Sequence, residues 1–340
     1  MTSALTAGIL VVSGGPLMPA TTATTAGTST AADADSTPAT SAQAGLSEPR
    51  RTIAGHRLRL RPVPRRVAAR TVYRSHTRLT SPPRVPLATW ALADLDTGEI
   101  LAAHGQRTRR QPASTIKLLS AVTAADRIDR RTRHRVAPAE ARPLSCVCVG
   151  LVPGRRYTRD ALMKATLLVS GNDAAEALAG ADPRGRAGFV RAMNRRADAL
   201  GARDTVAVNP SGLTGTGAAS TARDLLVLLR AAQADAAVSP MLGLESARFG
   251  PVRGAKRTIH RSNPYVDATP RSEGKTGYTR AAGFNLVVAT TVRDGDGTMR
   301  RIGAAAMGAP SRAASDRAVS RLTRWVARHH DSLSALGRLP

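Results

Sequence analysis

The sequence is poor in the residues that hold small or metal-dependent proteins together. Among 340 residues there are only two cysteines, Cys146 and Cys148. Two thiols can build neither a multi-bridge disulfide scaffold nor a four-thiolate zinc site. The seven histidines are scattered and form no HExxH motif. We therefore predict no metal site and no cofactor.

Aromatic residues make up only 3% of the chain, and acidic residues are few: 24 against 50 Lys and Arg. The formal net charge of +26 indicates an anionic partner or surroundings. Proteins that bind single-stranded nucleic acids interleave basic residues with stacking rings, which are scarce here, so a nucleic-acid partner is not predicted. Because only four of the basic residues are lysines, the position of each lysine is informative.

The apolar stretch near the N-terminus, residues 4–12, is too short to span a bilayer. Together with the small residues that follow Pro16 it is typical of a secretory signal, although no positive charge precedes it. We expect a signal peptide over residues 1–25 and an exported protein that acts at the cell wall or the membrane surface. A disordered alanine-rich tail is the alternative.

Residues 26–85 are expected to form a disordered linker. The first part, to about Gly45, is rich in Thr, Ala and Ser, which is typical of a flexible spacer. Residues 50–85 then carry eleven arginines and no acidic residue. This basic segment is either a simple arginine-rich tether or a binding element for an anionic polymer of the cell wall or for a membrane surface.

Regular hydrophobic patterning begins near Pro86 and continues to about residue 330. Alternating runs predict a hairpin at each end of this region, over 87–103 and 284–307. Helical periodicity predicts helices between and after these hairpins, over 114–126, 158–169, 187–200 and 313–329. The expected catalytic domain, residues 86–330, is therefore α+β: an antiparallel sheet flanked by helices, with an inserted all-helical lobe. Residues 331–340 are expected to form a tail.

A serine and a lysine stand three positions apart at the start of the predicted helix 114–126. This spacing brings the side chains of Ser114 and Lys117 to one face of the helix, where they can touch. A lysine amine of depressed pKa can accept the proton of a serine and so activate it as a nucleophile, which an arginine cannot do. Taken alone, the pair is also compatible with a capping serine and a surface lysine.

Two further motifs follow. Ser170-Gly-Asn172 comes after a predicted helix and before a turn over 173–179; its hydroxyl and amide could enter a cleft together, although the triplet is also common in turns. Lys275-Thr-Gly277 opens a predicted edge strand over 274–280. A cation and a hydroxyl at this point would bind a carboxylate, and the glycine would let a substrate backbone lie close.

The ordered set SxxK, SxN and KTG resembles the penicillin-recognising active-site serine enzymes. The wider sequence is similar to the D-alanyl-D-alanine carboxypeptidases among the low-molecular-mass penicillin-binding proteins, over roughly residues 86–330. Besides the motifs, the resemblance is carried by Asp96-Thr-Gly-Glu-Ile-Leu101, Met193-Asn, Asn209-Pro-Ser-Gly-Leu213, Ser220-Thr-Ala-Arg-Asp224 and Ala282-Gly-Phe-Asn-Leu286. The implied fold is the DD-peptidase/β-lactamase-like fold.

The resemblance also implies a role for each motif residue. Ser114 would be the acylated nucleophile and Lys117 the general base. Ser170 would relay a proton to the leaving group, and Asn172 would donate to the substrate peptide. Ser211 stands where many relatives have histidine, which leaves the role of its loop open.

On the substrate side, the resemblance implies that Lys275 and Thr276 hold the terminal carboxylate. The backbone N–H groups of Ser114 and Tyr278 would form the oxyanion hole. An arginine near the last helix often assists with the carboxylate in relatives, and the sequence alone does not assign it. The candidates are Arg312 and Arg317.

The implied function is removal of the terminal D-alanine from peptidoglycan stem pentapeptides through an acyl-enzyme, with β-lactams as inhibitors. One alternative is a β-lactamase-like hydrolase, which would need a base such as glutamate to release the acyl group. The glutamates between the second and third motifs, Glu176, Glu245 and Glu273, lack the Glu-x-x-Leu-Asn setting. Another alternative, a non-catalytic wall-binding protein, would have lost a motif residue, and none is lost.

Cys146 and Cys148 would point to one side of an extended segment. Outside the cell they can oxidise to a small ring or pair with another chain. Alternatively, they are two small buried apolar residues.

Overall fold

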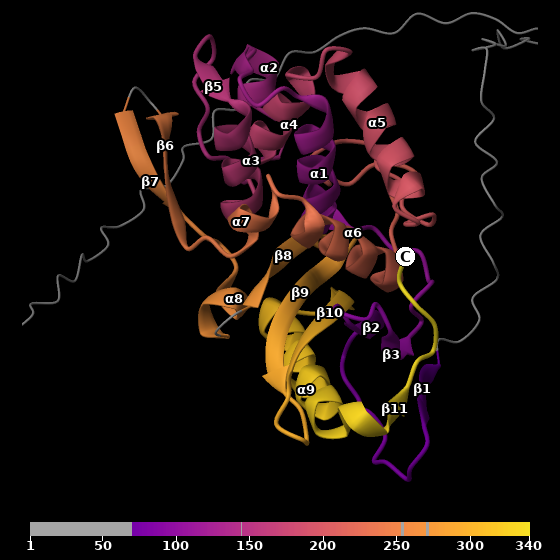
Figure 1. The fold of residues 1–340 in the computed structure, drawn as a ribbon. Helices are drawn as coiled ribbons and strands as arrows, with labels where there is room; N and C mark the ends of the chain where they lie inside the picture. The colour runs from indigo at the N-terminus through magenta and orange to yellow at the C-terminus, as the bar shows by residue number, and fades with distance from the viewer. Residues whose placement is uncertain (1–69, 144, 253–254, 270–271) are drawn as a thin grey trace, which may run out of the picture. The chain divides into compact units, whose positions relative to one another are not determined.

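The computed structural model describes residues 70–143, 145–252, 255–269 and 272–340 (Figure 1). The predicted signal peptide and most of the predicted linker, residues 1–69, lie outside the described residues. All of the described residues belong to one compact unit, Val63–Pro340.

A seven-stranded antiparallel sheet, in the order β11-β1-β3-β2-β10-β9-β8, is the frame of this unit (Figure 1). Its strands are β1 (Thr71–Ser75), β2 (Thr89–Asp94), β3 (Ile100–His104), β8 (Ser272–Thr279), β9 (Gly283–Arg293), β10 (Met299–Ala309) and β11 (Leu333–Ser334). Strands from the two ends of the domain pair in its middle, where β10 lies beside β2. The structure therefore confirms the predicted antiparallel sheet, and β8 lies at its edge as expected.

Local turn chemistry explains both predicted hairpins. Between β2 and β3, the Asp94 carboxylate accepts the N–H groups of Asp96 and Thr97, at 2.8 and 2.9 Å, and Gly98 follows with a φ of 78°. A second aspartate turn, closed by Gly297 at a φ of 91°, joins β9 to β10. Both glycines occupy the left-handed region that other residues adopt at a cost.

Most of the helices come between β3 and β8 in the chain and form a lobe on one side of the sheet, while α9 covers the opposite face (Figure 1). They are η1 (Ala113–Ile116), α1 (Lys117–Arg127), α2 (Pro138–Ala141), α3 (Arg159–Leu168), α4 (Asn172–Gly180), α5 (Gly185–Ala199), α6 (Ala222–Ala234), α7 (Ser239–Leu242), α8 (Pro264–Ala268), α9 (Arg312–His329) and η2 (His330–Ser332). Small antiparallel pairs are added by β4 (Arg133–Arg135) with β5 (Arg156–Thr158) and by β6 (Ser246–Val252) with β7 (Ala255–His260). Hydroxyl N-caps begin α3, α6 and α9.

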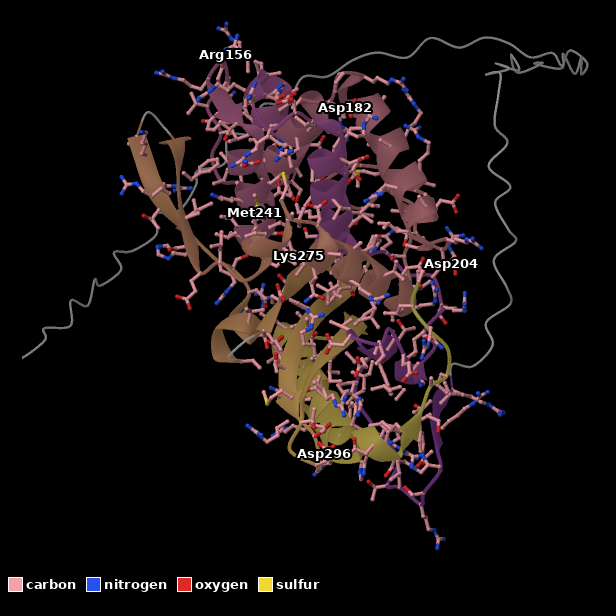
Figure 2. All side chains as sticks on the ribbon, viewed as in Figure 1. Arg156, Asp182, Asp204, Met241, Lys275 and Asp296 are labelled. Carbon is pink, nitrogen blue, oxygen red and sulfur yellow. A yellow bond between two sulfur atoms is a disulfide. The ribbon has the colours of Figure 1, made fainter. Side chains whose placement is uncertain are left out.

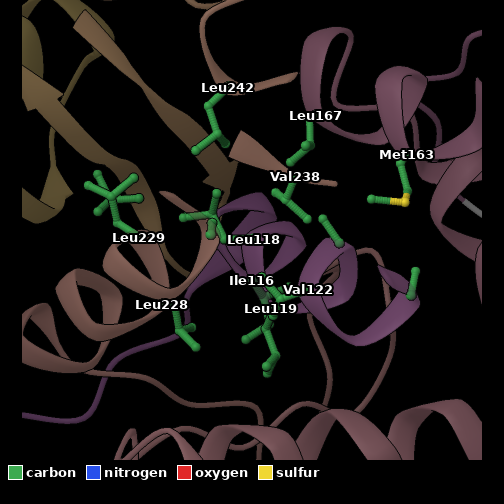
Figure 3. Packing of buried hydrophobic residues seen from close by; sticks show 14 of the residues in the cluster. Ile116, Leu118, Leu119, Val122, Met163, Leu167, Leu228, Leu229, Val238 and Leu242 are labelled. Carbon is green, nitrogen blue, oxygen red and sulfur yellow. The ribbon is translucent and has the colours of Figure 1, made fainter. Parts of the chain in front are cut away.

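Two hydrophobic clusters hold the layers together. One lies between α9 and one face of the sheet, and it includes Trp90 and Trp325. The other joins the opposite face to the helical lobe (Figure 3). In that cluster Leu118, Leu119 and Val122 of α1 pack with side chains from α3, α6 and α7. Burial of this kind stabilises the fold by about 1.5–3 kcal/mol for each large aliphatic side chain. None of the helices in the described part of the chain combines the length and the hydropathy needed to cross a bilayer.

The ordered domain extends beyond the predicted boundaries at both ends. Strand β1 lies within the predicted linker, and β11 lies within the predicted tail. Both are short strands that join the sheet through backbone hydrogen bonds, so arginine-rich or polar composition did not reveal them. Tyr73 of β1 also packs edge-on against Trp325, with ring centroids 5.6 Å apart. The predicted limits of the catalytic domain, residues 86 and 330, are therefore too narrow.

The predicted turn over 173–179 is also wrong, because these residues form α4.

Asn285 of β9 fastens the loop before η1 to the sheet. Its Nδ2 donates to the carbonyl oxygens of Gln111 and Pro112, both at 3.0 Å. Its Oδ1 accepts the backbone N–H of Gly308 at 2.9 Å, and the residue is only 2% exposed. One buried carboxamide thus fixes the position of the loop before η1 relative to the sheet.

We predict that Asn285→Ala lowers the free energy of unfolding by about 2–4 kcal/mol, because buried groups lose their hydrogen-bond partners. Urea denaturation of the purified protein measures this. Asn263 is a matched control: it is 5% exposed, and its carboxamide has no hydrogen-bond partner among the described residues. Asn263→Ala should cost less than about 1 kcal/mol. Equal losses in the two variants would show that the hydrogen bonds of Asn285 do not carry this stability.

Candidate active site

A cleft of about 230 Å³ opens between the edge strand β8, the helical lobe and the start of α9. Residues of all three predicted motifs line it, namely Ser114, Ser170, Thr276, Gly277 and Tyr278. Figure 2 shows Lys275 at the same junction, where β8 meets the helices. The structure therefore brings together residues that are separated by up to 164 positions in the sequence, from Ser114 to Tyr278.

Ser114 is held at the cleft by a tight backbone turn. The preceding residue, Ala113, has a φ of 49°, a left-handed conformation that is uncommon for alanine. Two segments that pack against this turn have glycine at the point of contact. A Cβ on Gly212 would lie 2.1 Å from the Ala113 carbonyl oxygen, and a Cβ on Gly277 would lie 2.9 Å from the Ser114 nitrogen. The third motif therefore contacts the backbone of the first directly.

Lys117 is fully buried at the first residue of α1. Its Nζ donates to Ser114 Oγ at 2.8 Å, to Asn172 Oδ1 at 2.7 Å and to the Ser211 carbonyl oxygen at 2.6 Å. Burial, and secondly the charge of Lys275, lower the pKa of the Lys117 ammonium well below its usual value. A lysine that becomes neutral at such a distance can accept the proton of the Ser114 hydroxyl.

The second motif lies between the two buried lysines. Ser170 ends the segment after α3 with a φ of 62°, and Asn172 is the first residue of α4. Ser170 Oγ accepts a hydrogen bond from Lys275 Nζ at 2.9 Å, while Asn172 Oδ1 accepts the one from Lys117. Asn172 Nδ2 donates to the Ser145 carbonyl oxygen at 2.8 Å, and its second amide hydrogen has no acceptor within the described ranges.

Lys275 is only 2% exposed, and its Nζ donates to Ser170 Oγ and to the Thr276 carbonyl oxygen, both at 2.9 Å. Burial, and secondly the charge of Arg312, lower the pKa of Lys275 to about 7. An anion that binds in the cleft would favour the charged form and would complete the set of partners of this ammonium group.

Arg312 is the functional candidate that the sequence left unassigned. It begins α9, lines the cleft and donates from Nη1 to the Ser262 carbonyl oxygen at 3.3 Å. Arg317, the other candidate, is not among the residues that line the cleft. Arg312 and Arg317 lie little more than one helical turn apart in α9. Which of the two reaches the cleft therefore depends on where this helix begins and on how it is oriented.

The loop at Ser211 contributes through its backbone. The Ser211 carbonyl oxygen accepts from Lys117, while its Oγ donates to Glu176 Oε1 at 3.2 Å. Arg186 Nε in turn donates to Glu176 Oε2 at 2.6 Å. A carbonyl oxygen is available from any residue type, so the loop can hold Lys117 without the histidine of many relatives. The carboxylate of Glu176 is engaged behind the cleft and does not line it.

The two cysteines form a disulfide, with Cα atoms 5.0 Å apart. The alternative of two buried apolar residues is wrong, since Cys146 is exposed. Val147, between them, lines the cleft.

Among the residues that the structure describes, one group could share a metal ion: Asp294, His330 and Asp331. Its ligand atoms already have protein partners. Asp294 is bound by Arg300 at 2.7 Å, and His330 lies 3.1 Å from Asp94. Neither this group nor the cleft therefore offers a free set of metal ligands in the described ranges.

Comparisons with known proteins agree with this geometry. A sequence profile described as D-alanyl-D-alanine carboxypeptidase matches residues 76–311. D-alanyl-D-alanine carboxypeptidase DacB2 of Mycobacterium tuberculosis is 42% identical over 202 residues, which cover 59% of this chain and 69% of that protein.

Two crystal structures extend the likeness to the fold. That of a D-alanyl-D-alanine carboxypeptidase from M. tuberculosis H37Rv is 37% identical, with a TM-score of 0.69 over 76% of this chain and 97% of its own. That of penicillin binding protein 6B from Escherichia coli is 32% identical, with a TM-score of 0.63 over 72% of this chain and 78% of its own. The chain therefore belongs to the D-alanyl-D-alanine carboxypeptidase family and is a serine-type enzyme of that activity.

Proposed function

We propose that Ser114 attacks the carbonyl carbon that links the last two D-alanines of a peptidoglycan stem pentapeptide. The new Oγ–C bond forms an acyl-enzyme, and the C–N bond to the terminal D-alanine breaks. Lys117 takes the proton of the Ser114 hydroxyl, and Ser170 passes a proton to the leaving amine. Water then cleaves the ester and restores Ser114. The observation that carries this proposal is the buried Lys117 Nζ, 2.8 Å from Ser114 Oγ.

The proposed substrate contacts follow from the same cleft. Lys275, Thr276 and Arg312 would bind the terminal carboxylate, because Thr276 and Arg312 line the cleft and the ammonium group of Lys275, in the strand position before Thr276, is close enough to interact with the charge of Arg312. The backbone N–H groups of Ser114 and Tyr278 would stabilise the negative charge that develops on the carbonyl oxygen. The close approach of β8 to the backbone at Ser114, which this arrangement needs, is supported by Gly277, where any side chain would collide with that backbone.

β-Lactams are the proposed inhibitors, and we expect their acyl-enzyme to persist. Release of the acyl group needs a base that activates water, and the glutamates considered above do not line the cleft. Glu273 accepts a hydrogen bond from Gln233 at 2.8 Å, and Glu245 lies on the surface. The name of the E. coli penicillin binding protein supports this proposal, which here rests on the chemistry of the cleft.

The substrate also suggests where the enzyme acts. Stem peptides are part of the cell wall, so we infer an extracytoplasmic location. The signal peptide proposed for residues 1–25 lies outside the described residues and stays a prediction. The same holds for binding of an anionic wall polymer by residues 50–85, of which only the last part is described.

We predict that penicillin adds one covalent equivalent to the protein at Ser114, and that Ser114→Ala abolishes the adduct while the fold is retained. Lys117→Arg should slow acylation by about 10² to 10⁴, because the charge is kept but no neutral amine is available. Intact-protein and peptide mass spectrometry measure both. Lys164→Arg, the same change on α3 away from the cleft, is the control and should acylate normally.

An adduct that persists in Ser114→Ala, or that maps to another serine, would contradict the assignment of the nucleophile. Normal acylation in Lys117→Arg would place the general base elsewhere.

We further predict that a peptide ending in D-Ala-D-Ala loses its terminal residue about 30-fold to several-thousand-fold faster, in kcat/KM, than the same peptide with an amidated C-terminus. The preference should fall as the pH rises through about 7, because the free enzyme then loses the ammonium charge of Lys275. Titration of Lys117 affects both peptides alike and cancels in the ratio. Release of the terminal residue from the two peptides, followed between pH 6 and 9, measures the ratio.

Lys275→Ala should slow the acid peptide selectively, whereas Lys256→Ala, an exposed lysine on β7, should not. Equal rates for acid and amide in the wild-type enzyme would show that these residues do not recognise a carboxylate. An endopeptidase or a general esterase would then be the better description.

A further inference from the structure

Exposed apolar side chains mark one part of the cleft. Among the described residues, four large hydrophobic side chains are exposed, and two of them line the cleft beside Ser114: Val147, 56% exposed, and Tyr278, 54% exposed. They come from different elements, a loop of the helical lobe and the edge strand β8. Apolar surface left in water inside a cleft is typical of a site that a ligand covers.

The loop that carries Val147 is fastened directly to the second motif. The Val147 carbonyl oxygen accepts the backbone N–H of Asn172 at 2.7 Å, and the Ser145 carbonyl oxygen accepts Asn172 Nδ2 at 2.8 Å. The disulfide between Cys146 and Cys148 closes the backbone around Val147. Any movement of this loop would therefore also move the hydrogen-bond acceptors of Asn172.

A second attachment holds the other end of the loop. The carboxylate of Asp173 accepts the backbone N–H groups of Val149, Gly150 and Leu151, at 3.0, 2.8 and 3.0 Å. Asp173 is fully buried in the first turn of α4, next to Asn172. The loop is thus fixed on both sides of Val147, and this side chain is presented to the cleft by a rigid frame.

The direction of the proposed substrate places its third residue near this side chain. In the proposed function its carboxylate binds at Lys275 and Thr276, and its scissile carbonyl at the Tyr278 N–H. An extended peptide advances about 3.3 Å per residue. The residue that precedes D-Ala-D-Ala would therefore lie at Tyr278 or just beyond it, in the cleft that Val147 and Tyr278 both line.

We propose that Val147 is a specificity-determining residue. Its side chain, together with Tyr278, contacts the aliphatic part of the residue that precedes D-Ala-D-Ala, and the Cys146–Cys148 disulfide positions it. This inference rests on the proposed function, because it uses the orientation of a peptide whose carboxylate lies at Lys275. Val147 has no part in the acyl transfer itself.

The test compares kcat/KM for diacetyl-Lys-D-Ala-D-Ala and acetyl-Gly-D-Ala-D-Ala, which differ in the side chain before D-Ala-D-Ala. The wild-type enzyme should prefer the lysyl peptide. Val147→Ala should reduce this preference by about 5- to 20-fold, mainly through KM, and Val147→Ile should keep it. Val72→Ala, the same change at an exposed valine of β1 away from the cleft, is the matched control and should leave the preference unchanged.

The disulfide is tested separately. Replacing Cys146 and Cys148 together by serine should reduce the preference in the same way, and it should also lower kcat for both peptides, because Asn172 loses fixed acceptors. Dithiothreitol should act on the wild-type enzyme in the same direction. In that step the disulfide takes two electrons and two protons from the reagent, which closes to its cyclic disulfide. The double serine variant should not respond.

Two outcomes would overturn the inference. If Val147→Ala keeps the wild-type preference as Val72→Ala does, Val147 does not contact the substrate. If only the double serine variant loses the preference, the disulfide supports the fold and not a substrate contact. A wild-type enzyme that releases no D-alanine from either peptide would instead overturn the proposed function, and this inference with it.

Discussion

Two ammonium groups, buried directly behind serines that line one cleft, are the constraint on which the rest of the site depends. Lys117 and Lys275 are both almost inaccessible to water, and the charge of Lys275 helps to lower the pKa of Lys117. At a pH below its lowered pKa each lysine is charged, and burial of this charge costs folding free energy. Oxygen atoms placed around the ammonium group offset the cost. Ser114, Asn172 and Ser211 supply them for Lys117, and Ser170 supplies one for Lys275.

These oxygen atoms come from segments that are distant in the sequence, so the fold has to bring these segments together around the two lysines. The sheet fixes β8 and, through Asn285, the entry to η1. The helical lobe fixes α1 and α4 against each other through its apolar cluster. Glycines stand where β8 and the Ser211 loop approach η1 too closely for a side chain. The contacts that hold these elements together therefore also position the groups around the two lysines.

Much of this arrangement could be predicted from the sequence. The spacing of Ser114 and Lys117 is a property of a helix, and it predicted their contact correctly. Alternating runs and aspartate–glycine turns predicted the two hairpins. Features made by backbone atoms could not be predicted, because every residue carries the same carbonyl and N–H groups. The Ser211 carbonyl oxygen, β1 and β11 belong to this class. The choice of Arg312 depended on the exact start of α9, which periodicity does not fix.

The two edges of the sheet differ in a way that bears on how the enzyme meets other chains. One edge ends in β11, which pairs over only two residues, while the other ends in the eight-residue strand β8. An extended peptide can add to such an open edge as a further strand, held by main-chain hydrogen bonds whatever its side chains are. A long unpaired edge is also a template for association between copies of a protein. Among the described residues this edge lies at the cleft beside the buried cations, so under the proposed function a strand that adds there would meet a requirement for a free carboxylate, and main-chain pairing would be combined with selection at the end of the chain.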